Sequence, residues 1–186
     1  RKLFEHALKT NIERLLILED DVLPHNNFGE ELLKILENER CGGHLFSDKE
    51  GGTLQLGATI WDKGAWIVVD NDLAKARGAF GEEPLCFNSY VSVSGAFAVI
   101  FHRNTFQEVV DWLNFGPTQP WDWVFGWLAK KGYITRVAYP FIVIPDITGE
   151  SDITRNRGPL QHDMMESASL HRWHQGSFKE SAENLG

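Results

Sequence analysis

Apolar residues recur every three or four positions in four parts of the chain. This spacing places them on one face of an α-helix, so it predicts amphipathic helices there. The predicted helices cover the first dozen residues and the segments 27–40, 104–115 and 120–131. Asn27 and Asn104 are the expected N-caps of the second and third helices, with Glu30 and Gln107 at the capping-box position. Gly132 is the expected end of the fourth.

Five other segments are rich in apolar and β-branched residues and predict strands. They are Leu15–Leu18, Thr53–Thr59, Tyr90–Phe101, Ile134–Ala138 and Phe141–Ile144. The first is a continuous apolar run, which is typical of a central strand buried on both faces. Between residues 60 and 90 the pattern is irregular, and only Trp66–Val69 indicates a short strand. We expect this segment to be either a functional loop region or a surface insertion without a role.

Helices and strands alternate along the 186 residues, which predicts one α/β domain. We expect this domain to span residues 1–158 and a polar, partly disordered tail to follow over 159–186. The formal net charge of -8 argues against a nucleic-acid backbone or an anionic membrane as the main partner. No apolar run approaches a transmembrane span, and no signal peptide is visible. Cys41 and Cys86 are either free thiols or one bridge.

The first predicted strand ends in three acidic residues, Glu19, Asp20 and Asp21. If the strand continues, Glu19 and Asp21 project to one side and Asp20 to the other. Two carboxylates on one side repel each other unless a cation lies between them. Mg²⁺ and Mn²⁺ prefer oxygen ligands and leave room for substrate phosphates, so a metal–diphosphate site is one interpretation. The other is a solvated acidic turn.

Several motifs in order resemble glycosyltransferase family 25, the lipooligosaccharide and procollagen galactosyltransferase type. The motifs are LLILEDDV, LQLGAT, VSGAFAVIFHRNTF, PWDWVFGWL and YPFIVIPDITGESDI, and they extend from about Leu15 to Ile153. The resemblance implies a GT-A-like, Rossmann-type αβα sandwich with a mixed, mainly parallel central sheet. The family's opening strand helps to hold the nucleotide base. The chain begins at Arg1, without Met, so we expect that strand to lie upstream and to be missing here.

The resemblance also implies an inverting transferase that uses Mn²⁺ or Mg²⁺ and a nucleotide-diphosphate sugar, with a UDP-sugar expected. Asp21 would be the direct metal ligand, Glu19 would point toward the metal or ribose, and Asp20 would support the loop. The trio Glu19-Asp20-Asp21 replaces a strict Asp-x-Asp motif, a variant usual in the family. Asp122, between Trp121 and Trp123, is the candidate base for the acceptor hydroxyl. Its alternative role is a helix N-terminal charge.

Four further positions and segments are weaker candidates. Ser94 and Gly95, with Ala96, would let the donor sugar approach the backbone, or they form a structural bulge. Ser151, Asp152 and Arg155 would bind the diphosphate, or they form a solvated loop. His162 would complete the metal shell, or it is an exposed tail residue. Trp121 and Trp123 are candidate sugar platforms, whereas Trp127 is expected in the core.

The expected function is transfer of a hexose, galactose-like, to a glycan, a lipid-linked sugar or a hydroxylated protein side chain. The irregular segment 60–90 would then lie on the acceptor side. One alternative is a degenerate or non-catalytic carbohydrate-binding domain. Another is a Mg²⁺-dependent phosphohydrolase, although the Asp-x-Asp-x-Thr/Val pattern of that chemistry is missing. The resemblance allows either a bacterial-type cytoplasmic location or a procollagen-type location in the endoplasmic reticulum lumen.

Overall fold

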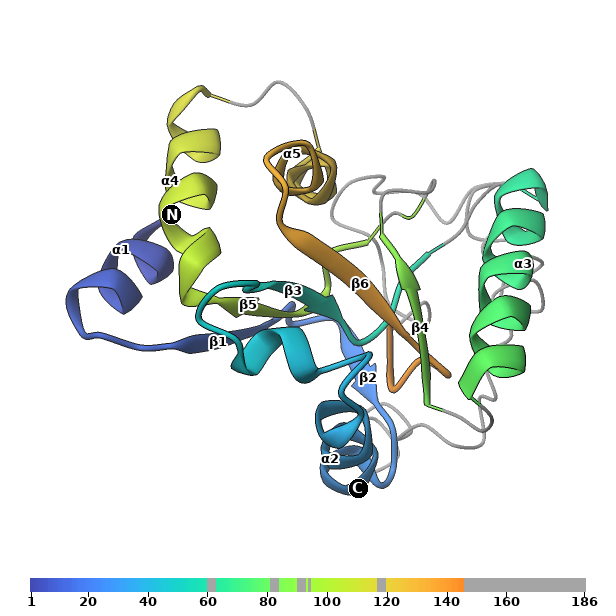
Figure 1. The fold of residues 1–186 in the computed structure, drawn as a ribbon. Coiled ribbons are helices and arrows are strands. Elements are labelled where there is room, and N and C mark those ends of the chain that lie inside the picture. Colours follow the sequence, from blue (N-terminus) through green and yellow to red (C-terminus); the bar gives the residue numbers. More distant parts are fainter. Residues whose placement is uncertain (60–62, 81–83, 90–92, 94, 117–119, 146–186) are drawn as a thin grey trace.

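In a computed structural model, the chain forms a mixed five-stranded sheet with helices on both faces (Figure 1). The structure describes residues 1–59, 63–80, 84–89, 93, 95–116 and 120–145. The strands, in the order β1-β5-β3-β6-β4, are Arg14–Leu18, Ala98–His102, Gly52–Gln55, Ile134–Tyr139 and Leu85–Asn88. A second sheet pairs β2 (Val22–Pro24) with β7 (Val143–Pro145).

The expectation of a mainly parallel sheet is wrong. Among the described strands, only β3 and β6 pair in parallel, and the other three pairs of the large sheet are antiparallel. The connection from β1 to β3 contains a helix and leaves these two strands running in the same direction. β5, however, lies between them and is antiparallel to both. The chain is therefore α/β with a mixed sheet, and the helical connection from β1 to β3 does not make these two strands neighbours.

β1 is an edge strand, so the prediction of a central strand buried on both faces is also wrong. It pairs only with β5 among the described residues. Leu15 and Ile17 are half-buried on the covered face, while Leu16 and Leu18 remain 38% and 47% exposed. A continuous apolar run does not reveal which strands lie beside it or which of its faces is covered.

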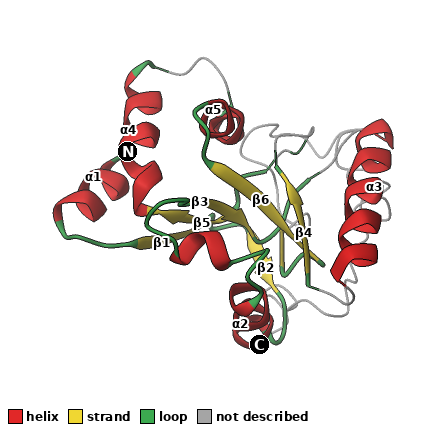
Figure 2. Cartoon of the chain, viewed as in Figure 1, coloured by secondary structure: helices red, strands yellow, loops and turns green. Residues whose placement is uncertain are grey.

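Helices cover both faces of the sheet (Figure 2). The α-helices are α1 (Lys2–Lys9), α2 (Phe28–Glu37), α3 (Lys63–Phe80), α4 (Phe106–Asn114) and α5 (Val124–Lys130). Short 3₁₀ turns are η1 (Gly43–Phe46), η2 (Arg103–Thr105) and η3 (Trp121–Trp123). β5 shows the division: Val99 and Phe101 pack with α1, α4 and α5, whereas Ala98 and Ile100 pack with α2 and η1. The alternation of side chains along one strand thus separates two cores.

α3 lies where the pattern appeared irregular, so the short strand at Trp66–Val69 and the loop region around it are wrong predictions. Val69, Leu73 and Ala76 follow a spacing of four and three residues and pack against Leu85 and Phe87 of β4. This apolar stripe is narrow, and the exposed residues around it include apolar Ile67 and Val68 as well as polar side chains. Tertiary packing against the sheet therefore stabilises a helix that local periodicity barely indicates.

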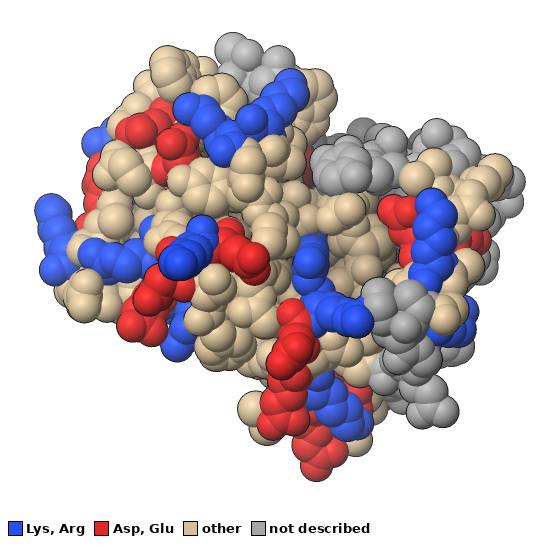
Figure 3. All heavy atoms as spheres, in the orientation of Figure 1, with Lys and Arg blue, Asp and Glu red and all other residues tan. Residues whose placement is uncertain are grey.

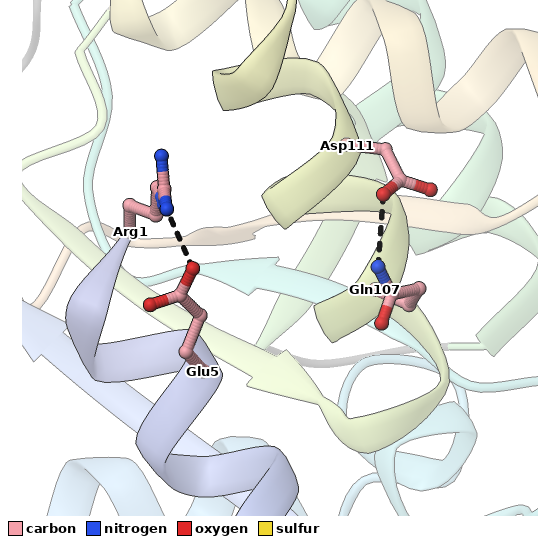
Figure 4. A network of polar contacts seen from close by, with 4 residues as sticks. All are labelled: Arg1, Glu5, Gln107 and Asp111. Carbon is pink, nitrogen blue, oxygen red and sulfur yellow. Dashed lines mark hydrogen bonds and ion pairs between the residues drawn. The ribbon is translucent and has the colours of Figure 1, made fainter.

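The predicted capping boxes are not formed, although the helices themselves are present. Asn27 occupies the N-cap position of α2 without a side-chain capping bond. Asn104 lies inside η2, where its side chain donates to Asp48 O at 2.7 Å. Gln107 Nε2 donates instead to Asp111 Oδ1, one turn along α4, at 2.8 Å (Figure 4). His102 accepts the Asn104 N–H and caps the turn that precedes the helix.

Two long-range contacts fix the ends of the sheet. Arg103, at the end of β5, donates to the carbonyls of Leu8 and Ile12 at 3.1 and 3.2 Å and so holds α1 against the sheet. A disulfide joins Cys41, after α2, to Cys86 in β4, with a Cα–Cα distance of 5.3 Å. Of the two states left open for the cysteines, the structure has the bridge. It secures the edge strand opposite β1.

Candidate active site

Glu19 lies at the carboxyl end of β1, where the covered face of the sheet begins. Its N–H donates to Phe97 O at 2.9 Å, so the pairing with the β5 side continues one residue beyond the strand. This continuation keeps Glu19 in the alternation of Leu15 and Ile17, toward the face that α5 covers. Asp20 and Asp21 then form a turn into β2. The predicted alternation of side chains therefore stops at Glu19, because the next two residues leave the extended conformation.

Asp122 lies in η3, directly before α5, and the loop preceding β5 holds its carboxylate. The Gly95 N–H donates to Asp122 Oδ2 at 3.2 Å. Gly95 O in turn accepts a hydrogen bond from Gln55 Nε2 at 2.9 Å. Gln55 is fully buried at the end of β3. One chain of contacts thus links the end of a central strand to the candidate base.

The backbone conformation at position 95 favours glycine. Its φ of +88° lies in the left-handed region, which side chains with a Cβ rarely adopt. A Cβ on Gly95 would also lie 2.5 Å from the Phe97 ring. This conformation aims the Gly95 N–H at Asp122, so the glycine contributes to positioning the carboxylate. Ser94, the other half of this prediction, lies outside the described residues.

The four acidic side chains at this end of the sheet interact. Partial burial of the carboxyl group raises the pKa of Glu19, and the charges of Asp21, Asp20 and Asp122 raise it further. The residue still retains contact with solvent. Because the charge of Asp122 acts on Glu19, the fold has brought together two carboxylates that are far apart in the sequence. A cation placed among them would relieve this repulsion.

Two polar atoms beside these carboxylates have no partner within the described part of the chain. They are Asp122 Oδ1 and Gln55 Oε1, both buried. A buried acceptor without a donor costs free energy, so such atoms in a folded protein require an explanation. A ligand hydroxyl in contact with Asp122 Oδ1 would supply the missing donor. Gln55 was not predicted as a site residue, although a glutamine inside the apolar stretch TLQLGAT was a possible signal.

The donor set suits a hard cation only in part. No group of three His, Cys, Asp or Glu side chains in the described ranges is arranged to hold a metal ion. The carboxylates of Glu19 and Asp21 offer only oxygen ligands. Mg²⁺ is often held by one or two carboxylates, with substrate phosphates and water filling the other positions. The residues therefore fit an ion that arrives with a diphosphate better than a closed structural site.

The tryptophans beside Asp122 differ from each other. Trp121 packs into the core, with its ring centroid 5.8 Å from that of Trp112 and 6.2 Å from that of Phe101. Trp121 is nevertheless only partly buried, and its part in a sugar platform stays a prediction. Trp123 is 58% exposed and can still contact a ligand. Trp127 packs partly buried against the same core, as expected.

The remaining candidates, Ser151, Asp152, Arg155 and His162, lie outside the described residues. No family model matches the chain, and no curated protein matches it. Among the described helices, none combines the length and the apolar character needed to cross a membrane.

Proposed function

We propose that this chain is a glycosyltransferase domain that moves a hexose from a nucleotide-diphosphate sugar to a hydroxyl acceptor, with inversion at the anomeric carbon. The observation that supports this proposal best is the environment of the Asp122 carboxylate. Its Oδ2 is held by the Gly95 N–H, its Oδ1 is buried without a partner, and its charge acts on Glu19. A positioned carboxylate beside an acidic strand end suits both base catalysis and a cation-bound diphosphate.

In the proposed reaction, the acceptor hydroxyl lies against Asp122 Oδ1 and transfers its proton to that carboxylate. The acceptor oxygen forms a bond to the anomeric carbon as the bond from this carbon to the diphosphate breaks. The diphosphate leaves with the electron pair. The Gly95 N–H keeps Asp122 in place during the transfer, because its hydrogen bond occupies the other carboxylate oxygen.

Glu19 and Asp21 are the proposed residues for a divalent cation, with the diphosphate completing its coordination. When bound, this ion would stabilise the negative charge that develops on the leaving group. Burial raises the pKa of Glu19, and the charges of Asp21, Asp20 and Asp122 raise it further, so a nearby cation would offset the second effect. Family 25 remains the proposed relationship, and it is based on the motifs and their order.

The test is a screen of nucleotide sugars with the full chain in Mn²⁺, followed by variants of Asp122 and Asp21. Asp122→Asn should lower the transfer rate by about 10²–10⁴-fold while donor binding in Mn²⁺ is retained, because only the proton acceptor is lost. Asp21→Ala should remove the metal-dependent donor binding with little change in Tm. Asp111→Asn is the matched control, because this carboxylate lies on the exposed surface of α4.

Transfer rates normalised to folded protein distinguish the possible roles. A rate for Asp122→Asn within a few-fold of the unmodified chain would remove Asp122 from the mechanism. Binding of glycan without turnover of any nucleotide sugar would favour the non-catalytic carbohydrate-binding domain. Metal-dependent release of phosphate from phosphomonoesters would favour the phosphohydrolase.

A further inference from the structure

A hollow of about 570 Å³ lies along β4, at the opposite edge of the sheet from the acidic strand end. Its walls come from β4, from α3, from the chain after α2 and from β6. This volume is within the range of pockets that bind small molecules. None of the acidic candidates Glu19, Asp21 and Asp122 lines it. An inference about this hollow is therefore independent of the proposed transfer reaction.

Positively charged side chains dominate the hollow. Arg40, Lys75 and Arg136 line it, and Asp72 is the one acidic residue among the described lining residues. Asp72 pairs with Lys75 at 3.7 Å, so its carboxylate is directed to the cation on α3 and not to Arg136. Figure 3 shows Lys and Arg side chains on the face that contains β6 and β4, with Asp and Glu side chains beside them. A local positive excess in a chain with a net charge of -8 favours an anionic ligand at this place.

Arg136 is the central residue of this charge group. It is half-buried on β6, and burial lowers the pKa of its guanidinium, while the charge of Glu50 acts in the opposite direction. None of the ion pairs within the described ranges includes Arg136. A guanidinium presents its donors in a planar fork that matches the oxygens of phosphate and carboxylate groups. A bound oxyanion would compensate for the lost hydration of this side chain.

The wall beside these charges is apolar and covalently fixed. It includes Ala76, Pro84 and the Cys41–Cys86 disulfide. Asn38 Nδ2 donates to Pro84 O at 3.0 Å, so the segment before β4 is tied to the end of α2. Such a wall is preorganised, which reduces the entropy lost when a ligand binds. An apolar surface next to a cationic one suits a ligand that contains both kinds of group.

We propose that this hollow is a second binding site, for a small organic anion. Its phosphate or carboxylate group contacts Arg136, with Arg40 and Lys75 contributing positive charge. The apolar part of the ligand lies against Ala76, Pro84 and the disulfide. Phosphate and carboxylate share the chemistry that the guanidinium recognises, and the experiment separates them.

The experiment measures binding of phenyl phosphate, benzoate and inorganic phosphate to the full, oxidised chain by titration calorimetry. Phenyl phosphate or benzoate should bind more tightly than inorganic phosphate, because only these two reach the apolar wall. Arg136→Gln should weaken binding of the preferred probe about tenfold or more, since hydrogen bonds to charged groups are the strong ones. Lys75→Gln, at a side chain that is 80% exposed, should weaken it only a few-fold.

Lys130→Gln is the matched control, because it removes one exposed positive charge on α5, away from the hollow. This control should leave binding unchanged. Equal affinities for Arg136→Gln and the unmodified chain would overturn the proposal. So would inorganic phosphate binding as tightly as both aromatic probes, since the apolar wall would then contribute nothing. If Arg136→Gln fails to fold, Lys75→Gln against Lys130→Gln decides, and equal affinities for those two would overturn it.

Discussion

The two edge strands of the large sheet differ in charge. The end of β1 places Glu19, Asp20 and Asp21 near Asp122, whereas Arg40, Lys75 and Arg136 surround β4. The net charge of -8 reflects neither region, because it sums over the whole chain. The two proposed ligands differ accordingly, a cation with its diphosphate at one edge and an organic anion at the other.

The pKa values of Glu19 and His44 shift in opposite directions for the same physical reason. At the acidic edge, partial burial and three carboxylates raise the pKa of Glu19. On the other side, burial lowers the pKa of His44 to about 4, and Arg136 adds to that effect. In both cases the surroundings disfavour the charged form of the group. Burial is the larger cause for both groups, and like charge nearby adds to it in each case.

The β4 edge is fixed by a disulfide. Removing this disulfide should have the largest effect on stability. The Cys41–Cys86 bridge closes a loop with a sequence separation of 45 residues. Cys41→Ser/Cys86→Ser should lower the free energy of unfolding by about 2–4 kcal/mol, because the unfolded chain gains freedom. Urea unfolding measures this loss. Binding of phenyl phosphate should weaken as well, while the response to Mn²⁺ at β1 is retained.

Reductant provides the control for this prediction. It should shift the unfolding midpoint of the unmodified chain and leave that of Cys41→Ser/Cys86→Ser in place. Equal stability of the double variant and the oxidised chain would show that the bridge adds nothing to the β4 edge.

Much of the local structure could be predicted from the sequence, whereas the arrangement of the sheet could not. Strong periodicity located α1, α2, α4 and α5, and Gly132, with a φ of +92°, follows α5 as expected. The apolar runs located β5 and β6. The direction of β5 between β1 and β3 is set by tertiary contacts, and the apolar run of β1 is the same for an edge and a central position. α3 was missed because its apolar stripe is narrow.

The candidate active site and the hollow at β4 also depend on tertiary contacts that local sequence patterns do not reveal. Glu19 and Asp122 were both predicted as candidates, but their positions depend on other elements. Gly95 and Gln55 hold Asp122, whereas the Phe97 carbonyl accepts the Glu19 N–H. The catalytic roles of Glu19 and Asp122 stay predictions. The hollow at β4 was not predicted at all. Arg40, Lys75 and Arg136 come from three separate segments of the chain, so no local pattern indicates that they line one space.

The next largest effect on stability is the pH dependence that comes from His44, whose pKa is influenced by the charge of Arg136. His44 is buried, with its Nε2 3.1 Å from Thr53 O, so the neutral ring donates to that carbonyl. Its pKa is about 4 in the folded state, against an ordinary value of 6.5. Between these values the unfolded chain binds more protons, so stability falls as the pH drops. Because one pKa unit corresponds to 1.36 kcal/mol, the free energy of unfolding should fall by roughly 3 kcal/mol between pH 7 and pH 4.

Unfolding free energies at pH 7 and pH 4 test this, with His44→Gln as the comparison. The variant should lose about 3 kcal/mol less than the unmodified chain over that range, whatever its stability at pH 7. Arg136→Gln sharpens the result, because removal of that charge should raise the midpoint of the His44 NMR titration while leaving it below 6.5. Identical pH dependence with and without His44 would contradict the assignment.

The smallest effect is expected at the acidic edge, from Glu19→Gln. Since the folded-state pKa of Glu19 is raised above 4.5, the native chain binds the proton more tightly than the unfolded chain does. Stability from this group is present at low pH and is lost as the pH rises through the folded-state pKa. The glutamine should therefore raise Tm at pH 7 and have no such effect below pH 4.5. Contact with solvent limits the gain to roughly 1–2 °C.

Thermal unfolding of Glu19→Gln, compared with Glu13→Gln as the control, measures this small effect. Glu13 lies at the start of β1 and pairs with Arg14 at 3.1 Å, so its replacement should leave Tm unchanged or lower it slightly. Mn²⁺ should stabilise the unmodified chain more than Glu19→Gln, because a cation acts on the same repulsion that the substitution removes. A lower Tm for Glu19→Gln than for the unmodified chain at pH 7 would mean that the carboxylates at β1 do not repel one another. The contrast between the two edges would then depend on the cations around β4 alone.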